Sequence, residues 1–297
     1  MKILVTGSQG QVGWELARAL LPFGDIIAAD RDFMDLSNLA VLRQTLQQIK
    51  PDIIVNAAAY TAVDKAESDQ DAAFVLNTKV PEIMAEEAAK NRTLLIHYST
   101  DYVFDGSKAT AYNEADSTNP INVYGQSKLA GEQAIQSTDA DYLIFRTSWV
   151  YGLRGQNFVN TILRLAAERE ELNIVADQIG APTWARLIAE TTSLVLKQVL
   201  QEQIQGSFSS GIYNLTATGS TSWHAFAQAI VELARQQGAD LKVQQINPIP
   251  TEAYPVPANR PKNSHMSTAL LEQRFNLLMP AWETALKLCM QGLVLKQ

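Results

Sequence analysis

Apolar runs and amphipathic stretches alternate through the first half of the chain. The apolar runs do not alternate between apolar and polar positions, which is typical of parallel strands that helices cover on both faces. The predicted strands are at 2–6, 25–29, 52–56, 93–99 and 142–147. The stretches between them repeat apolar residues at helical spacing, and the predicted helices are at 12–21, 38–48, 71–90 and 124–136. We therefore expect an α/β fold with a doubly wound parallel sheet of the Rossmann type.

The regular alternation ends after residue 150. Helical patterns separated by loops remain, at 158–169, 184–201 and 222–237. The proline-rich stretch at 247–263 is unsuited to a helix or a central strand, so it should lie extended over the surface. We therefore expect 1–150 to form a dinucleotide-binding domain and 151–297 to form mainly a smaller substrate-binding lobe. The chain should return to the first domain near 155–170 and 210–235.

Composition narrows the class of protein. Hydrophobic residues make up 46% of the chain and charged residues 19%, and the net charge is −7, so we expect a soluble acidic protein without a nucleic-acid partner. The only cysteine, Cys289, lies in a stretch of helical pattern, which excludes an intrachain disulfide and a cysteine zinc site. No apolar run approaches the ~20 residues of a membrane span, so we expect no membrane partner and a cytoplasmic location.

Three glycines mark a candidate cofactor site. Gly7, Gly10 and Gly13 follow the first predicted strand and open the first predicted helix. A tight turn, a close approach of the backbone to a pyrophosphate and close helix packing all disfavour a Cβ atom at such positions. The free N–H groups of the helix N-terminus would then bind the anion. The glycines alone also fit an ordinary strand-to-helix turn, but their context favours a dinucleotide.

That context is the end of the second predicted strand. Asp30 can accept hydrogen bonds from an adenosine ribose, which favours NADH, whereas Arg31 can offer a cation to a 2′-phosphate, so NADPH stays open. Asp35 and Leu36 can flank the adenine, although Asp35 equally fits a helix-entry motif. The small residues ending in Ala59, after the third strand, leave room for a cofactor or for close helix packing.

Tyr124 and Lys128 are the candidate reacting residues. They lie one turn apart on one face of a predicted helix, and a neighbouring ammonium would lower the pKa of a tyrosine. The pair is common by itself, but its place between the fourth and fifth strands brings it to the edge where open sheets form active sites. Ser99 and Thr100 end the fourth strand at the same edge, where their hydroxyls can bind a substrate carbonyl or close a local turn.

The histidines offer no metal centre. His97 has apolar neighbours on a predicted strand and no second histidine or cysteine nearby, so it is expected to be a core histidine. His224 and His265 are isolated as well. Metal catalysis is therefore not expected.

At these residues the chain resembles the extended short-chain dehydrogenase/reductases and, within them, the dTDP-4-dehydrorhamnose reductase family. The resemblance runs nearly end to end, over VTGSQGQVG, VNAAAYTAVDKAE, HYSTDYVFDG, NVYGQSKLAGE, FRTSWVYG, DQIGAPT and YPVPANRPKNS. It implies Tyr124 as proton donor, Lys128 as its partner and Thr100 as the hydroxyl that tunes it. The implied cofactor-binding residues are Gly7, Gly10, Gln11, Val12, Gly13, Asp30, Arg31, Asp35, Leu36, Ala59, Tyr60, Thr61, Tyr98, Tyr124 and Lys128. The implied substrate-binding residues are Ser99, Thr100, Asp101, Tyr124, Trp149 and Arg260.

The implied activity is reduction of dTDP-4-dehydro-L-rhamnose to dTDP-L-rhamnose, for cell-surface polysaccharide synthesis, by hydride transfer from NADPH or NADH to the C4 ketone. A nucleotide-sugar 4-epimerase or 4,6-dehydratase is the enzymatic alternative, but a dehydratase usually carries a second carboxylate after Asp101, and position 102 is tyrosine. A non-catalytic NADP-binding regulatory subunit is the alternative of another class. The intact Tyr124, Lys128 and Thr100 favour an enzyme.

The resemblance departs at one candidate metal site. Some family members are described as Mg²⁺-dependent dimers that use carboxylates from the first helix and from the helix after Ala-Pro-Thr. Glu15 and Glu190 are present here, but position 186 is arginine where such members carry glutamate. A cation beside a metal site is unfavourable. The sequence therefore disfavours a metal-bridged dimer and leaves a monomer or a homodimer open.

Overall fold

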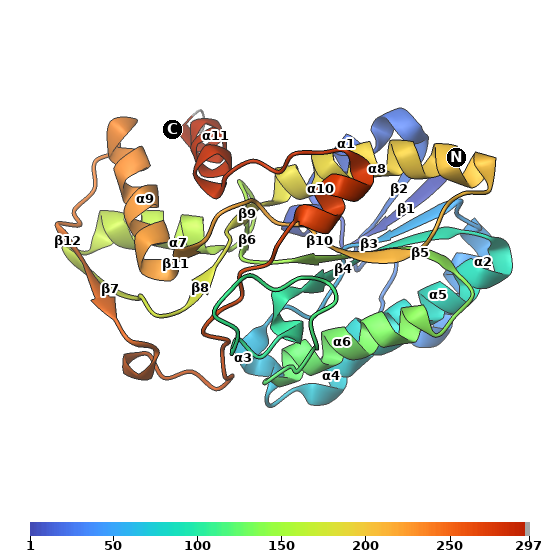
Figure 1. Cartoon of the computed structure of the whole chain (residues 1–297), viewed down its shortest axis with the longest axis horizontal. Coiled ribbons are helices and arrows are strands. Elements are labelled where there is room, and N and C mark those ends of the chain that lie inside the picture. The colour runs from blue at the N-terminus through green and yellow to red at the C-terminus, as the bar shows by residue number, and fades with distance from the viewer. Residues whose placement is uncertain (295–297) are drawn as a thin grey trace.

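The computed structural model describes residues 1–294, and its centre is a parallel six-stranded sheet of order β10-β5-β4-β3-β1-β2 (Figure 1). Its strands are β1 Lys2–Thr6, β2 Asp25–Ala29, β3 Ile53–Asn56, β4 Leu94–Thr100, β5 Asp141–Thr147 and β10 Gly211–Asn214. The strand order reverses direction after β1, which is the arrangement of a doubly wound sheet. The predicted Rossmann-type fold is therefore confirmed. The sequence does not predict the sixth strand, β10, because its residues Gly-Ile-Tyr-Asn do not form a continuous apolar run.

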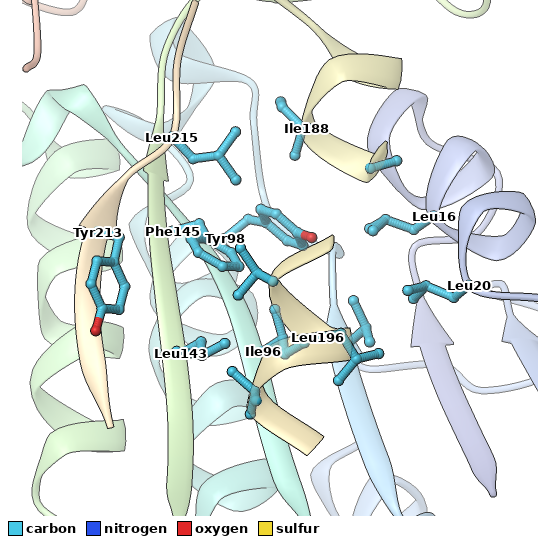
Figure 2. Packing of buried hydrophobic residues seen from close by; sticks show 14 of the residues in the cluster. Leu16, Leu20, Ile96, Tyr98, Leu143, Phe145, Ile188, Leu196, Tyr213 and Leu215 are labelled. Carbon is cyan, nitrogen blue, oxygen red and sulfur yellow. The ribbon is translucent and has the colours of Figure 1, made fainter. Parts of the chain in front are cut away.

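Helices cover both faces of this sheet. The helices on one face include α1 Gln11–Ala19, α8 Ala185–Gln205 and α10 Ala269–Phe275, and those on the other include α2 Leu39–Ile49, α5 Val80–Asn91 and α6 Val123–Gln136. Successive residues of a strand point to opposite faces, so Ile3 packs in the core on the side of α1 and α8, and Leu4 in the core on the side of α2 and α5. Figure 2 shows the core on the side of α8, which includes Tyr98 of β4 and Ile188 of α8. Because both faces are covered, the strands read as continuous apolar runs.

The single helix predicted at 71–90 is divided. It consists of α4 Gln70–Phe74, a π-helical turn at Val75–Lys79 and then α5. Asn77 in the π turn is fully buried and donates from Nδ2 to the carbonyl of Tyr60 and to Oγ of Ser127. Such turns often occur at functional sites, and here the turn ties the segment after β3 to α6.

The later part of the chain builds a second core beside the sheet. Its helices are α7 Phe158–Glu168, α9 Trp223–Gln236 and α11 Trp282–Val294, and its small sheets pair β6 Val150–Tyr151 with β9 Thr183–Trp184, β7 Glu171–Val175 with β12 Gln245–Ile249, and β8 Ile179–Gly180 with β11 Thr221–Ser222. Within 155–170, the buried side chains of α7 pack in this second core instead of returning to the large sheet. Within 210–235, β10 joins the large sheet but α9 packs against α7.

The proline-rich stretch runs along the outside of the molecule, as expected. Its first residues belong to β12, which has only β7 as a neighbour, so Pro248 sits in an edge strand where a missing N–H is tolerated. The remaining short elements of the chain are α3 Val63–Ala66 and the 3₁₀ turns at Leu21–Phe23, Asp101–Val103 and Thr251–Ala253. Within residues 1–294, no helix is both long enough and apolar enough to cross a membrane.

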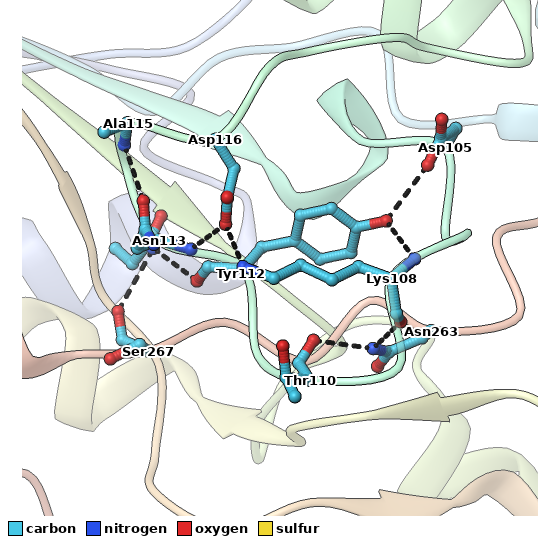
Figure 3. Close-up of polar contacts among 10 residues, drawn as sticks. Asp105, Lys108, Thr110, Tyr112, Asn113, Ala115, Asp116, Asn263 and Ser267 are labelled. Atoms are coloured by element: carbon cyan, nitrogen blue, oxygen red, sulfur yellow. Dashed lines mark hydrogen bonds and ion pairs between the residues drawn. The ribbon is translucent and has the colours of Figure 1, made fainter.

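The loop 104–122 joins the 3₁₀ turn that follows β4 to α6. Hydrogen bonds connect it to the C-terminal part of the chain (Figure 3). The phenol of Tyr112 donates to Asp105 and accepts from the backbone N–H of Lys108, both at 3.0 Å. The side-chain amide of Asn263 donates to the carbonyls of Lys108 and Thr110. These bonds hold the loop in place directly after the strand-end residues that form the site described below.

Candidate active site

The glycines after β1 are required by close contacts between backbone segments. Gly7 has φ +66°, and a Cβ atom there would lie 2.8 Å from the backbone nitrogen of Ala58. A Cβ atom on Gly13 would lie 2.2 Å from the carbonyl oxygen of Gly7. No side chain caps the first turn of α1 at Gly10, so its N–H groups are free to meet an anion.

Two cavities lie along the carboxyl ends of the strands. One of about 720 Å³ is lined by the predicted adenosine residues, and one of about 700 Å³ by the predicted reacting residues. The two cavities share the residues Gly7, Gln9, Gly10, Ala58 and Ala59. Together they form a groove that crosses the point where the strand order reverses, which is where ligands bind in such sheets.

Local hydrogen bonds favour the ionised form of two carboxyl groups at the adenosine end, those of Asp30 and Asp35. Asp30 accepts a 2.9 Å hydrogen bond from the backbone N–H of Phe33, which lowers the pKa of its carboxyl. Asp35 accepts from both the backbone N–H and the hydroxyl of Ser37, and these bonds lower its pKa. Asp35 therefore closes a local turn, although it also lines the cavity, as do Arg31 and Leu36.

Lys128 is buried at the reacting end. The helix α6 begins at Val123 because the side chain of Asn122 caps it, and Lys128 follows Tyr124 by about one turn. The side chain of Lys128 is 1% exposed, and its Nζ donates to the carbonyl of Tyr98 at 2.6 Å and lies 3.2 Å from Nε2 of His97. Burial lowers the pKa of Lys128 to about 8, and the charge of Glu132 opposes this shift.

Tyr124 keeps its proton at neutral pH. Burial raises the pKa of its phenol to about 12; the side chain of Thr100 lowers it in part, and the charge of Asp101 raises it further. The expectation that Lys128 would lower this pKa is therefore wrong for this structure, because the hydrogen bonds of Nζ go to Tyr98 and His97. A protonated phenol is suited to act as an acid.

The end of β4 brings unsatisfied polar atoms into the cavity. Thr100 donates from its hydroxyl to Asp101 at 2.9 Å. Within residues 1–294, the hydroxyl of Ser99, Oδ2 of Asp101 and Nε of Arg260 are buried without a hydrogen-bond partner, and all three residues line the cavity. Burial also raises the pKa of Asp101 to about 6. Buried polar atoms are normally paired, so this set fits a polar ligand.

Three of the expected residues have hydrogen-bond partners that do not line the reacting cavity, and a fourth, Gly13, serves helix packing. The phenol of Tyr98 lies in the core and shares a 2.7 Å hydrogen bond with Thr192. Tyr60 lies at the adenosine cavity and donates to Asp69. Gly13 lines neither cavity and serves the packing of α1. Arg260 reaches the rim of the cavity, where its Nη2 lies 2.8 Å from Oδ2 of Asp64. The remaining expected residues at the rim and floor are Gln11, Val12, Ala59 and Thr61.

Trp149 lies at the wall of the same cavity with a partner that the sequence did not reveal. Its φ is +46°, a strained value for a residue with a side chain. Its indole stacks on that of Trp223 with ring centroids 3.5 Å apart and planes at 6°. Trp223 begins α9 and also lines the cavity. No local motif marks Trp223, because only the packing of the second core brings it to β6.

Comparison with known proteins agrees with this arrangement. The sequence profile of the family described as RmlD substrate binding domain matches residues 1–295. The chain belongs to the dTDP-4-dehydrorhamnose reductase family. A relative of that name from Burkholderia thailandensis is 52% identical over 296 residues, or 99% of both chains. One from Escherichia coli is 47% identical, over 97% of this chain and 96% of the relative.

Solved structures of family members have the same fold. A dTDP-4-dehydrorhamnose reductase from Clostridium acetobutylicum superimposes with a TM-score of 0.89 at 34% identity, over 99% of both chains. Another from Bacillus anthracis, solved in complex with NADP, gives a TM-score of 0.87 at 37% identity, over 98% of this chain and 99% of that one. A UDP-glucose 4-epimerase from Thermus thermophilus gives 0.79 over 99% of both chains, but at 18% identity it shares the fold alone.

The candidate metal site of the family is taken by an ion pair. Nε of Arg186, on α8, lies 3.4 Å from Oε2 of the largely buried Glu15, on α1. The guanidinium also lies over the ring of Trp184. Among the residues that the structure describes, no group of three or more histidine, cysteine, aspartate or glutamate residues could hold a metal ion. A guanidinium repels a divalent cation, so the side chains present at this position do not fit Mg²⁺.

Proposed function

We propose that the chain reduces dTDP-4-dehydro-L-rhamnose to dTDP-L-rhamnose with NADPH or NADH. Full-length similarity to relatives of that name supports the substrate, and the NADP complex of a family member supports the cofactor. The observation that carries the proposal is the protonated phenol of Tyr124 at a cavity that also holds the unpartnered hydroxyl of Ser99. The nicotinamide, when bound, supplies the hydride that the C4 carbonyl carbon accepts.

The residues of the chain supply the proton and stabilise the developing charge. Tyr124 donates its phenolic proton to the carbonyl oxygen as that oxygen becomes an alkoxide. The unpartnered hydroxyl of Ser99 would donate to the same oxygen, and Thr100 would join it by turning its hydroxyl proton from Asp101 to the substrate. Lys128, which Tyr98 and His97 hold beneath the site, would bind the nicotinamide ribose. The ketone thus gains one hydride and one proton.

The groove fits the proposed cofactor. The uncapped N-terminus of α1 would hold the pyrophosphate through backbone N–H groups of Gln11 and Val12. The ionised carboxylate of Asp30 would accept from the adenosine ribose, and the exposed Arg31 would meet a 2′-phosphate. The two residues favour different cofactors, so we propose activity with both NADH and NADPH.

The sugar nucleotide would occupy the other side of the cavity. Asp101, through its unpartnered Oδ2, and Trp149 would contact the deoxysugar. Arg260 would leave Asp64 to meet the phosphates. We propose a cytoplasmic location, because both ligands are phosphorylated and do not cross a membrane unaided, and a monomer or homodimer without a bridging metal.

The test is oxidation of NADPH and of NADH by the purified protein with dTDP-4-dehydrorhamnose, with and without EDTA. We expect turnover that EDTA leaves unchanged. Tyr124→Phe should lower kcat by roughly 10²–10⁴-fold while cofactor affinity stays within about twofold. Tyr142→Phe is the matched control, since Tyr142 is part-buried on β5 and does not line the cavity. A fully active Tyr124→Phe variant would exclude Tyr124 as the proton donor.

A further inference from the structure

A line of buried side chains crosses the sheet beneath Lys128. Thr6 on β1 donates from its hydroxyl to Oδ1 of Asn56 on β3 at 2.7 Å. Nδ2 of Asn56 lies 3.0 Å from Nδ1 of His97 on β4, and Nε2 of His97 lies 3.2 Å from Nζ of Lys128 on α6. Each of the four side chains is at most 1% exposed. The register of the strands produces the line, because Thr6 faces Asn56 and Asn56 faces His97 across neighbouring strands.

Among residues 1–294, no carboxylate forms an ion pair with Lys128. The nearest carboxylate on α6 is that of Glu132, which is held by Arg146 of β5 through two hydrogen bonds of 2.9 and 2.6 Å. The ammonium is therefore held by one backbone carbonyl and one imidazole nitrogen. His97 of β4 is in direct contact with Lys128, and the charge of Glu132 on α6 raises the pKa of the lysine. Arg146 of β5 holds Glu132, and Tyr124 and Asp101 line the same cavity as Lys128.

We propose that His97, supported by Asn56 and Thr6, is a positioning residue that holds Lys128 in place as the charged ammonium. The inference rests on the proposed function, since it concerns a lysine that lines the same cavity as Tyr124. His97 touches neither cavity, so its effect on the reaction passes through Lys128.

The hydrogen-bond chain can run in two directions, and each matches one protonation state of Lys128. A charged Lys128 donates to Nε2, so the ring proton of His97 lies on Nδ1 and is donated to the amide oxygen of Asn56. A neutral Lys128 can accept from Nε2–H instead, and Asn56 then donates to Nδ1 while Thr6 donates to the amide oxygen. The structure has the amide in the second orientation, with Nδ2 of Asn56 facing Nδ1 of His97 and Oδ1 accepting from Thr6. The arrangement with a charged Lys128 therefore requires a half-turn of the Asn56 amide.

His97 can do this because it stays uncharged. Burial lowers the pKa of His97 well below its ordinary value, and the charge of Lys128 lowers it further. A neutral imidazole always has one donor and one acceptor nitrogen. The tautomer of His97 should therefore report the charge of Lys128.

A direct test is ¹⁵N NMR of the imidazole nitrogens in the full-length protein. The chain has three histidines, and a His97→Asn variant identifies the signals of His97 by their loss. We expect the Nδ1–H tautomer at pH 6.5 and a change toward Nε2–H above about pH 8, where Lys128 loses its proton. The Nε2–H tautomer or an imidazolium at pH 6.5 would overturn the proposal. This measurement does not depend on reductase activity, so its failure is distinct from failure of the proposed function.

A kinetic test uses a matched pair of variants. His97→Gln carries an amide to the place of Nε2 and keeps an acceptor for Lys128, whereas His97→Asn keeps a partner for Asn56 and does not reach Lys128. In His97→Asn, loss of the acceptor should lower the pKa of Lys128. We therefore expect the alkaline limb of the kcat/KM profile of this variant to move to lower pH by about one unit, a tenfold change in the proton equilibrium. His97→Gln should keep the wild-type limb.

Equal losses of activity in both variants with an unchanged pH profile would show a purely structural histidine and overturn the proposal. Thermal unfolding of both variants separates loss of folding from loss of the contact. If His97→Asn does not fold, the tautomer of wild-type His97, identified with a folded His97→Gln variant, decides the question.

Discussion

The carbonyl oxygen of Tyr98 accepts a 2.6 Å hydrogen bond from Nζ of Lys128, although the phenol of Tyr98 points into the core toward Thr192. The backbone of β4 therefore orients the buried lysine, while the Tyr98 side chain anchors the strand against α8. This arrangement fixes the position of the Lys128 ammonium relative to Tyr124. It also makes the site depend on the register of β4 between β3 and β5.

The charge of Lys128 should set the alkaline limit of activity. Its pKa is lowered by burial to about 8, whereas that of Tyr124 is raised to about 12. The ammonium is therefore lost first as pH rises, and kcat/KM should fall above about pH 8. A pH profile of NADPH-dependent reduction from pH 6 to 10 measures this. The residual activity of Lys128→Met should not fall above pH 8. A wild-type profile that stays flat to pH 9.5 would contradict the assignment of the alkaline limit to Lys128.

Asp101 should make the folded state less stable as pH rises from 4 to 8. Burial raises its folded-state pKa from 3.8 to about 6, so the folded protein prefers the protonated form. The stability that this group contributes is present below pH 3.8 and is lost as pH rises through 6. Asp101→Asn removes that loss. Relative to wild type, the variant should gain about 2–3 kcal/mol of unfolding free energy between pH 4 and pH 8.

Urea unfolding at several pH values measures the Asp101→Asn effect. Asp105→Asn is a useful comparison, because hydrogen bonds led by the backbone N–H of Ser107 lower the pKa of Asp105. Its pH trend should have the opposite sign. A stability difference for Asp101→Asn that is the same at both pH values would mean that the pKa of Asp101 is the same in the folded and unfolded states.

Trp223 should influence binding of the sugar nucleotide through Trp149. Aromatic pairs contribute about 0.5–1.5 kcal/mol beyond the area they bury, so Trp223→Leu should raise KM for the sugar nucleotide roughly 2–10-fold. Cofactor affinity should not change. Trp282→Leu is the control, since Trp282 packs in the same core without lining the cavity. Steady-state kinetics with each ligand varied would refute the idea if both variants changed KM equally.

Gly13→Ala should destabilise the protein. The new Cβ atom would lie 2.2 Å from the carbonyl oxygen of Gly7, and a backbone atom cannot rotate away. Overpacking of this kind costs typically ~1–3 kcal/mol, which exceeds the helix-propensity gain of about 1 kcal/mol. Gly152→Ala, whose nearest contact would be 3.5 Å, should change stability by less than about 0.5 kcal/mol. Urea unfolding compares the two, and equal stabilities would refute the packing argument.

The sequence alone determined the nucleotide-binding half of the fold. Continuous apolar runs predicted the five strands from β1 to β5, since strands covered on both faces need apolar residues at every position. The same chain order put Gly7 and Gly10 at the start of α1 and Tyr124 at the start of α6. These features depend on residues that are close in the sequence, so their spacing along the chain is enough to predict them. The roles of the individual site residues and the division into domains stay predictions.

Other features depend on the tertiary structure and cannot be predicted from the spacing of residues along the chain. The π turn at Asn77, the short strand β10 and the place of α7 depend on contacts between distant segments. Trp223 meets Trp149 only because α9 packs beside β6. The sequence showed His97 as a core histidine, yet only the register of β1, β3 and β4 lines it up with Thr6, Asn56 and Lys128. The pKa of Tyr124 likewise follows from burial, which no local motif encodes.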